Sequence, residues 1–253
     1  MEAGLTTPWI VRPRPNPGAA LRLLCVPYAG GGASVFRRWP DGLPADVELL
    51  AIEPPGRETR LRERPFDQLG PLVEALADAV APRVRPPFAV YGHSLGALVA
   101  FGLARELRRR SLGEPVHLFV SGRRAPQLPE LSPSYHLPDP ALVDRLRRLG
   151  GIPDALFQEP DLLAFFLPIL RADLAVTETA VIPVDDPLAC PITALGGLSD
   201  ERASVAELEA WRAWTRGAFD REMFPGGHFF LQTERTAVLD ALSRRLARIA
   251  AAP

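Results

Sequence analysis

Short apolar runs alternate with amphipathic stretches along most of the chain. A run of mostly apolar residues that ends at a turn indicates a strand buried on both faces, whereas apolar residues at every third or fourth position indicate a helix. Strands are predicted at 21–26, 47–52, 88–91, 116–120, 192–195 and 219–224, and helices at 66–80, 95–110, 205–214 and 236–251. This alternation predicts an α/β fold with a mostly parallel central sheet flanked by helices.

The stretch from about 126 to 186 breaks the alternation, because it contains no strand pattern. The helices predicted there and the prolines that separate them are 139–149, 155–157 and 161–174, with Pro138, Pro153 and Pro160. An enlarged crossover is one interpretation, but a crossover between parallel strands needs only one helix of about a dozen residues. We therefore expect a helical lid at about 126–186, inserted into a single domain that spans 1–253.

The composition excludes several kinds of chemistry. The 29 basic and 30 acidic residues give a net charge of −1, so no global positive field favours nucleic acid as a partner. All the basic residues are arginines, which rules out Schiff-base lysines, Ser–Lys dyads and P-loop lysines. Cys25 and Cys190 are too few for a disulfide framework or a metal site built of cysteines, so both are expected to be reduced and structural, and no metal is expected.

No targeting or membrane signal is visible in the chain. Residues 1–18 lack the apolar segment of a secretory signal, and no run of about 18 uncharged apolar residues occurs that would span a membrane. The expected location is therefore the cytoplasm, with no membrane as partner.

The strongest chemical motif is Gly-His-Ser-Leu-Gly at 92–96. It follows the predicted strand 88–91 and opens the predicted helix 95–110, which is the setting of a nucleophile elbow. In such an elbow the serine adopts strained backbone angles, and the two glycines let strand and helix pack closely around the turn. Ser94 is thus the predicted nucleophile; the alternative is a chance match with a buried, hydrogen-bonded serine.

A serine nucleophile needs a base, and the chain has four histidines. His228 lies in a glycine-rich loop between the last predicted strand and the last helix, and it is the predicted base. The alternative is a loop histidine bonded to backbone. His93 lies inside the elbow and should point away from the nucleophile. His117 begins a core strand, where a structural role is expected, and His136 should be exposed in the lid.

A carboxylate must orient the imidazole, and with this elbow it follows the serine and precedes the histidine along the chain. Asp200, in the loop after the predicted strand 192–195, is the predicted residue. Glu201 is its near competitor, whereas Asp173 belongs to the lid and is less well placed. The alternative for Asp200 is a role as N-cap of the next helix.

Acyl transfer passes through an oxyanion, which needs preorganised backbone donors. The N–H of Leu95, directly after the nucleophile, is one predicted donor. The other comes from the loop after the first central strand, where Ala29 is the predicted residue and Tyr28 and Gly30 are alternatives. The three glycines at 30–32 also fit a flexible loop, but a phosphate-binding loop is excluded because no Gly-Lys pair follows.

Six short motifs, spread in order over 21–231, add a further signal. They are Pro27–Gly31, Pro55–Arg57, Gly92–Gly96, Ser121–Arg123, Arg171–Asp173 and Pro225–Phe229, together with the turn Gly197–Asp200. This set resembles that of the type II thioesterases, editing hydrolases that serve polyketide and nonribosomal peptide synthases. The resemblance implies an α/β-hydrolase fold with a helical lid, and it implies Ser94, Asp200 and His228 as the catalytic triad.

The resemblance also implies a reaction. Members of the family hydrolyse acyl-S-phosphopantetheine thioesters on acyl or peptidyl carrier proteins, and so remove aberrant or stalled acyl groups from a synthase. The expected protein is a stand-alone, monomeric serine hydrolase of thioesters that forms an acyl-serine, needs no cofactor of its own and has a carrier protein as partner. The alternatives are a general carboxylesterase or lipase, a product-releasing thioesterase domain, and a binding protein that has lost catalysis.

Two further features concern substrate and partner. Apolar lid residues either line an acyl chamber or belong to a lid core packed on the sheet; they are Leu163, Phe165, Phe166 and Leu167. The arginine pairs Arg123–Arg124 and Arg147–Arg148 either meet an acidic carrier protein or are ordinary solvated surface.

Overall fold

The computed structural model describes residues 7–84, 87–150 and 154–251. The two ends of the predicted domain and Pro153, which was expected to separate two lid helices, lie outside the described residues.

The described strands form one seven-stranded sheet. They are β1 (Ile10–Val11), β2 (Leu21–Val26), β3 (Val47–Ile52), β4 (Phe88–His93), β5 (His117–Ser121), β6 (Ile192–Gly197) and β7 (Phe219–Phe224), in the order β1-β3-β2-β4-β5-β6-β7. All neighbours pair in parallel except β1, which runs antiparallel to β3. The prediction of a mostly parallel sheet is confirmed, while the two-residue strand β1 was missed because it is too short to show a period.

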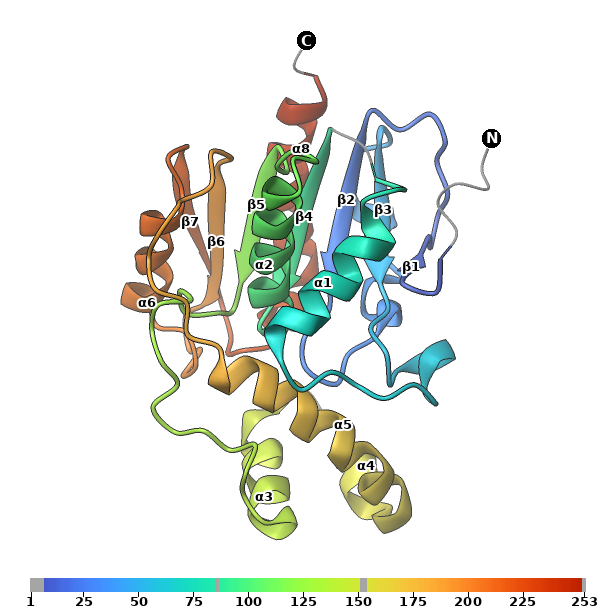
Figure 1. The fold of residues 1–253 in the computed structure, drawn as a ribbon, viewed down its shortest axis with the longest axis vertical. Coiled ribbons are helices and arrows are strands. Elements are labelled where there is room, and N and C mark those ends of the chain that lie inside the picture. Colours follow the sequence, from blue (N-terminus) through green and yellow to red (C-terminus); the bar gives the residue numbers. More distant parts are fainter. Residues whose placement is uncertain (1–6, 85–86, 151–153, 252–253) are drawn as a thin grey trace.

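Helices cover both faces of the sheet, with α1 and α2 on one face and α8 on the other (Figure 1). The described helices are α1 (Leu69–Val80), α2 (Leu95–Arg109), α3 (Asp139–Leu149), α4 (Asp154–Gln158), α5 (Pro160–Thr179), α6 (Val205–Glu209), α7 (Phe230–Thr233) and α8 (Arg235–Ala250). Within the described ranges, no helix is both long enough and apolar enough to cross a membrane.

The expected start of the first helix at residue 66 is wrong. The helix begins at Leu69, and Gln68 before it has an extended backbone (φ −135°, ψ 141°). Phe66 packs instead on the ring of Trp9, with the ring centroids 6.4 Å apart. The side chain of Phe66 fits the helical spacing of apolar residues, but it is apolar because it packs on Trp9 outside the helix.

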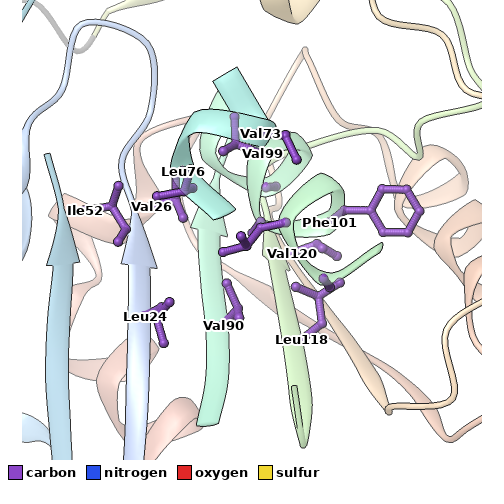
Figure 2. Close-up of a cluster of buried hydrophobic side chains, with 14 of the residues drawn as sticks. Leu24, Val26, Ile52, Val73, Leu76, Val90, Val99, Phe101, Leu118 and Val120 are labelled. Atoms are coloured by element: carbon purple, nitrogen blue, oxygen red, sulfur yellow. The ribbon is translucent and has the colours of Figure 1, made fainter. Parts of the chain in front are cut away.

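The strands are buried on both faces, as their unbroken apolar runs predict. Leu24 and Val26 of β2 belong to the core between the sheet and helices α1 and α2, which Figure 2 shows. Leu23 and Cys25 of the same strand belong to the core under α8. Cys190 is also buried, and both cysteines are free, so the expectation of two reduced, structural thiols is confirmed.

The three helices α3, α4 and α5 gather at one end of the sheet (Figure 1). They have a small core of their own, to which α3 and α5 contribute leucines. Of the four apolar residues singled out in this region, Leu167 is buried in that core and Leu163 and Phe166 pack against it, whereas Phe165 is 49% exposed. The helices of the insertion are thus held partly by one another.

The strand order creates a switch point beside β2. The chain passes from β2 to β3 on one side and then crosses back to β4 on the other side. The loops that follow β2 and β4 therefore emerge next to each other at the carboxyl edge of the sheet, where open α/β sheets bind their ligands. The first loop contains Ala29, and the second contains Ser94.

His117 in β5 has the structural role that the sequence predicts. Its Nε2 lies 2.8 Å from the Thr193 hydroxyl in the neighbouring strand. Burial disfavours the charged imidazolium, and together with the nearby Arg245 it lowers the pKa of His117 to about 4.

We expect His117→Gln to flatten the pH dependence of stability. The folded state resists protonation of His117 down to about pH 4, whereas the unfolded chain takes up the proton near its ordinary pKa of about 6.5. The cost to folding is therefore absent above about pH 6.5 and grows as the pH falls, to at most about 3 kcal/mol.

The measurement is urea unfolding of wild type and variant between pH 7 and pH 4. His136→Gln is the matched control, because His136 is exposed. Equal pH slopes for wild type and His117→Gln would contradict the assignment.

Candidate active site

Ser94 stands at a strained turn between β4 and α2. Its φ of 55° and ψ of −115° lie outside the regions that residues other than glycine prefer. The two glycines of the motif explain why the chain accepts this turn. A Cβ at Gly92 would lie 2.0 Å from the carbonyl oxygen of Gly96, and a Cβ at Gly96 would lie 2.2 Å from that of Val26. The prediction of a strained, closely packed elbow is confirmed.

The structure brings Ser94, His228 and Asp200 together from three different loops. The Oγ of Ser94 lies 3.0 Å from Nε2 of His228, and Nδ1 of the same ring lies 2.9 Å from Oδ2 of Asp200. The side chain of Asp200 is fully buried and that of His228 is 9% exposed. A buried carboxylate in this position selects the tautomer with the proton on Nδ1, which leaves Nε2 free to accept the serine proton.

The loops of His228 and Asp200 are joined directly by backbone contacts. Leu198 N–H donates to the Phe224 carbonyl at 2.8 Å, and Ser199 N–H donates to the Gly226 carbonyl at 2.9 Å. The loops approach so closely that a Cβ at Gly197 would lie 2.4 Å from the carbonyl oxygen of Gly227. The spacing between carboxylate and imidazole is thus set by the pairing of β6 with β7.

The alternatives for the carboxylate do not match the geometry. The N-cap of α6 is Ser204, which forms a capping box with Glu207, so Asp200 is not a helix cap. The second carboxylate oxygen of Asp200 accepts the N–H of Arg202 at 2.8 Å. Glu201 is exposed to solvent. Of the carboxylates considered from the sequence, Asp200 is the one bonded to His228.

His93 lies beside the site but has a different bonding partner. Its Nδ1 lies 2.9 Å from the Ser121 hydroxyl, and its ring centroid is 5.1 Å from that of His228. Complete burial, followed by the charge of His228, holds the pKa of His93 well below its ordinary value. Burial therefore favours the neutral form of His93. His136 is exposed, as expected.

The loop after β2 has two of its N–H groups engaged. Gly30 N–H donates to Oδ2 of Asp173 at 2.7 Å, and Gly31 N–H donates to the carbonyl of Tyr28 at 2.9 Å. Gly30 was one of the alternatives for the oxyanion donor, and its N–H already has this partner. Of the oxyanion donors predicted in this loop, Ala29 and its alternative Tyr28 remain. The other predicted donor is the N–H of Leu95, at the start of α2.

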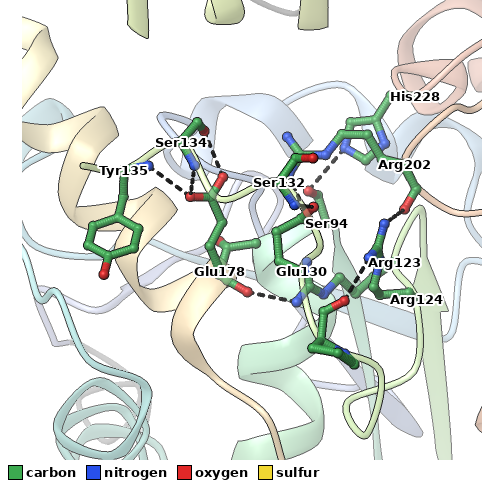
Figure 3. Close-up of polar contacts among 12 residues, drawn as sticks. Ser94, Arg123, Arg124, Glu130, Ser132, Ser134, Tyr135, Glu178, Arg202 and His228 are labelled. Carbon is green, nitrogen blue, oxygen red and sulfur yellow. Dashed lines mark hydrogen bonds and ion pairs between the residues drawn. The ribbon is translucent and has the colours of Figure 1, made fainter. Parts of the chain in front are cut away.

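Buried arginines connect the site to α5, and sequence reasoning missed both connections. Arg57 forms an ion pair with Asp173, and Arg123 donates to the Thr177 carbonyl at 2.7 Å. Burial lowers the pKa of Arg123 to about 10. Figure 3 shows the polar contacts of Arg123 and Arg124 in the same view as Ser94. Arg57, Arg123 and Asp173 belong to motifs of the resemblance, but no local pattern indicates their partners.

The interpretation of Arg123–Arg124 as a surface for an acidic partner is wrong. The two residues are only 5% and 8% exposed, and they donate to backbone carbonyls inside the protein. Arg147 and Arg148 of α3 are exposed. Among the residues that the structure describes, no cluster of three or more histidine, cysteine, aspartate or glutamate side chains is arranged to hold a metal ion.

Comparison with known proteins places this geometry in a family. Residues 21–246 match the family model described as a thioesterase domain. The chain is 44% identical over 246 residues to the gramicidin S biosynthesis protein GrsT of Aneurinibacillus migulanus, covering 97% of this chain and 96% of that protein.

Solved structures agree with this match. The thioesterase RedJ of the prodiginine pathway in Streptomyces coelicolor is 44% identical, with a TM-score of 0.84 over 89% of this chain and 85% of that one. The type II thioesterase BorB of the borrelidin cluster is 35% identical, with a TM-score of 0.85 over 94% and 97% of the two chains. The expected α/β-hydrolase fold is thereby confirmed.

We expect Ser94→Gly to be more stable than Ser94→Ala. Both variants lose the hydrogen bond to His228, but glycine adopts a positive φ without strain, whereas alanine keeps the strain. The expected difference in the free energy of unfolding is about 1 kcal/mol. Urea denaturation measures it.

Ser243, inside α8, provides the control for this comparison. There the alanine variant should be the more stable one by about 1 kcal/mol, because glycine is unfavourable within a helix. The same order at both positions would contradict backbone strain at Ser94.

We expect Asp200→Asn to lower kcat for an activated ester by about 10⁴-fold, because the amide holds the imidazole in the wrong tautomer. Glu201→Gln changes the neighbouring, exposed carboxylate and should leave kcat within about twofold of wild type, as surface changes usually do. Steady-state kinetics with circular dichroism to verify folding measures both. A similar decrease of kcat in the two variants would contradict the assignment of Asp200 as the residue that orients His228.

Proposed function

Since this chain belongs to the thioesterase family, we propose that it removes acyl groups from the phosphopantetheine arm of carrier proteins in a polyketide or nonribosomal peptide synthase. As a member of that family it is a hydrolase of thioesters. The observation that carries the proposal is the continuous chain of hydrogen bonds from the Ser94 hydroxyl through His228 to Asp200. This is the arrangement that hydrolysis through an acyl-serine requires.

In the proposed first step, Ser94 Oγ attacks the thioester carbonyl while its proton passes to Nε2 of His228. The carbonyl oxygen becomes an oxyanion, to which the N–H groups of Ala29 and Leu95 donate. The tetrahedral intermediate then expels the pantetheine sulfur, which leaves as a thiol after taking the proton from His228. Asp200 stabilises the imidazolium that exists between these two proton transfers.

In the second step, water hydrolyses the acyl-serine. His228 Nε2 takes a proton from the water as its oxygen attacks the ester carbonyl, and an oxyanion forms at the same two backbone donors. Collapse of this intermediate returns the proton to Ser94 Oγ and releases a carboxylic acid. Water and the residues of the chain supply every atom and proton that the two steps need, so the proposed reaction requires no cofactor beyond the phosphopantetheine of the substrate.

The partner in this proposal is an acyl or peptidyl carrier protein. The relatives named above belong to the gramicidin S, prodiginine and borrelidin biosynthetic pathways. Exposed Arg147 and Arg148, in the last turn of α3, offer positive charge on the insertion. A local patch of this kind would attract an acidic carrier protein, since the chain as a whole is nearly neutral.

The test is hydrolysis of a panel of acyl groups loaded on a purified carrier protein, with the matching p-nitrophenyl esters in parallel. We expect kcat/KM for the carrier-bound thioesters to exceed that for the esters by at least tenfold (~1.4 kcal/mol of additional transition-state stabilisation). Ser94→Ala should lower kcat by about 10⁴-fold or more. Ser132→Ala, an exposed serine of the insertion, is the control and should behave as wild type.

Two outcomes would contradict the proposal. Faster turnover of simple esters than of carrier thioesters would favour a general carboxylesterase. Unchanged hydrolysis by Ser94→Ala would show that Ser94 is not the nucleophile.

A further inference from the structure

Arg57 and Asp173 form a buried ion pair to which the proposed mechanism assigns no role. Their side chains are 6% and 3% exposed. Arg57 follows β3, and it also donates to the carbonyl of Pro55 in its own loop. Asp173 lies in the middle of α5. The pair therefore joins the insertion to a loop at the carboxyl edge of the sheet.

The same carboxylate oxygen has a second partner, which is the loop of the proposed oxyanion hole. Oδ2 of Asp173 accepts the N–H of Gly30 at 2.7 Å in addition to the guanidinium of Arg57. Leu170, one turn earlier in α5, packs on the same glycine, since a Cβ at Gly30 would lie 2.7 Å from its Cδ2. Helix α5 thus contacts this glycine through both a polar and an apolar side chain.

The anchored peptide is adjacent to a proposed donor. The N–H of Gly30 belongs to the peptide bond that follows Ala29, so fixing it limits the rotation of the Ala29 backbone. Gly30 has a φ of +77°, and two more glycines follow it, so the loop has many accessible conformations when nothing holds it. A hydrogen bond to a buried, charged acceptor is among the stronger ways to select one of them.

We propose that Asp173, held in place by Arg57, is a positioning residue that fixes the loop after β2 so that the N–H of Ala29 points at the oxyanion. This inference rests on the proposed function only in needing an oxyanion at Ser94. In this proposal the acceptor that orders the oxyanion hole comes from α5, within the insertion. The oxyanion hole is then ordered only when α5 lies where Asp173 can accept the N–H of Gly30.

The test compares two double variants that both lack the buried charges. Arg57→Met with Asp173→Asn retains an oxygen that accepts the N–H of Gly30, whereas Arg57→Met with Asp173→Leu retains none. Neither leaves an unpaired charge in the interior, and replacing a buried ion pair by neutral side chains is often tolerated by the fold. The difference between the two variants therefore isolates the hydrogen bond to the loop.

We expect kcat for an activated ester to stay within about fivefold of wild type with asparagine and to fall by about 10²-fold with leucine, as for a misplaced oxyanion donor. KM should change little in either variant. An alkyl boronic acid adds to Ser94 Oγ as a tetrahedral boronate whose oxygen stands for the oxyanion. Its affinity should fall in parallel with kcat.

Glu178→Gln is the matched control, because Glu178 is a buried carboxylate of the same helix with a different loop as its partner. It accepts the N–H groups of Ser134 and Tyr135, within the insertion (Figure 3). This variant should lower the melting temperature while leaving kcat and boronate affinity unchanged. Equal kcat in the two double variants, with changes only in melting temperature, would overturn the proposal and reduce the ion pair to a structural contact.

The outcome is separable from that of the proposed function. Activated esters and boronic acids report on Ser94 and its oxyanion hole whatever the natural substrate is. If the wild type does not hydrolyse carrier thioesters but the two double variants differ as expected on activated esters, the proposed function is refuted and the role of Asp173 is supported.

Discussion

The close approach of β4 and α2 at Ser94 is the constraint on which the rest of the site depends. Gly92 and Gly96 let three backbone segments meet at distances that no side chain would allow, and this contact holds Ser94 at a positive φ. The serine hydroxyl then stands at the carboxyl edge of the sheet, at the start of a helix whose dipole favours developing negative charge. The strain, about 1–3 kcal/mol, is tolerated because the large apolar cores on both sheet faces hold the elbow in place.

Around this fixed point, buried carboxylates set the positions of mobile groups. Asp200 holds the imidazole of His228, and Asp173 holds the backbone of Gly30. In both cases a charged acceptor with low exposure is completed by a second donor, the N–H of Arg202 in one and the guanidinium of Arg57 in the other. A carboxylate bound by two donors is restricted in its movement, and rigidity is what an oxyanion hole needs before the charge develops.

Much of the fold and the centre of the site could be predicted from local patterns. The six longer strands lie where apolar runs end at turns, and the elbow motif located the strained turn at Ser94 and the helix that follows it. Prediction was poorer where a side chain serves a distant contact. Phe66 matches the helical period but packs on Trp9, and Arg123 and Arg124 are charged residues that are nevertheless buried against backbone carbonyls. The pattern of apolar and charged residues along the chain does not indicate which distant residue each side chain contacts.

The sequence by itself determined the succession of strands and helices along the chain, the exclusion of lysine chemistry, and a candidate nucleophile whose local turn is encoded within five residues. The tertiary structure alone decided which N–H groups of the loop after β2 are engaged and that α5 contacts this loop. The reason is separation along the chain. Gly30 and Asp173 are 143 positions apart, and Ser94 and His228 are 134 apart. Only the strand order, with its switch point beside β2, brings such residues within hydrogen-bonding distance.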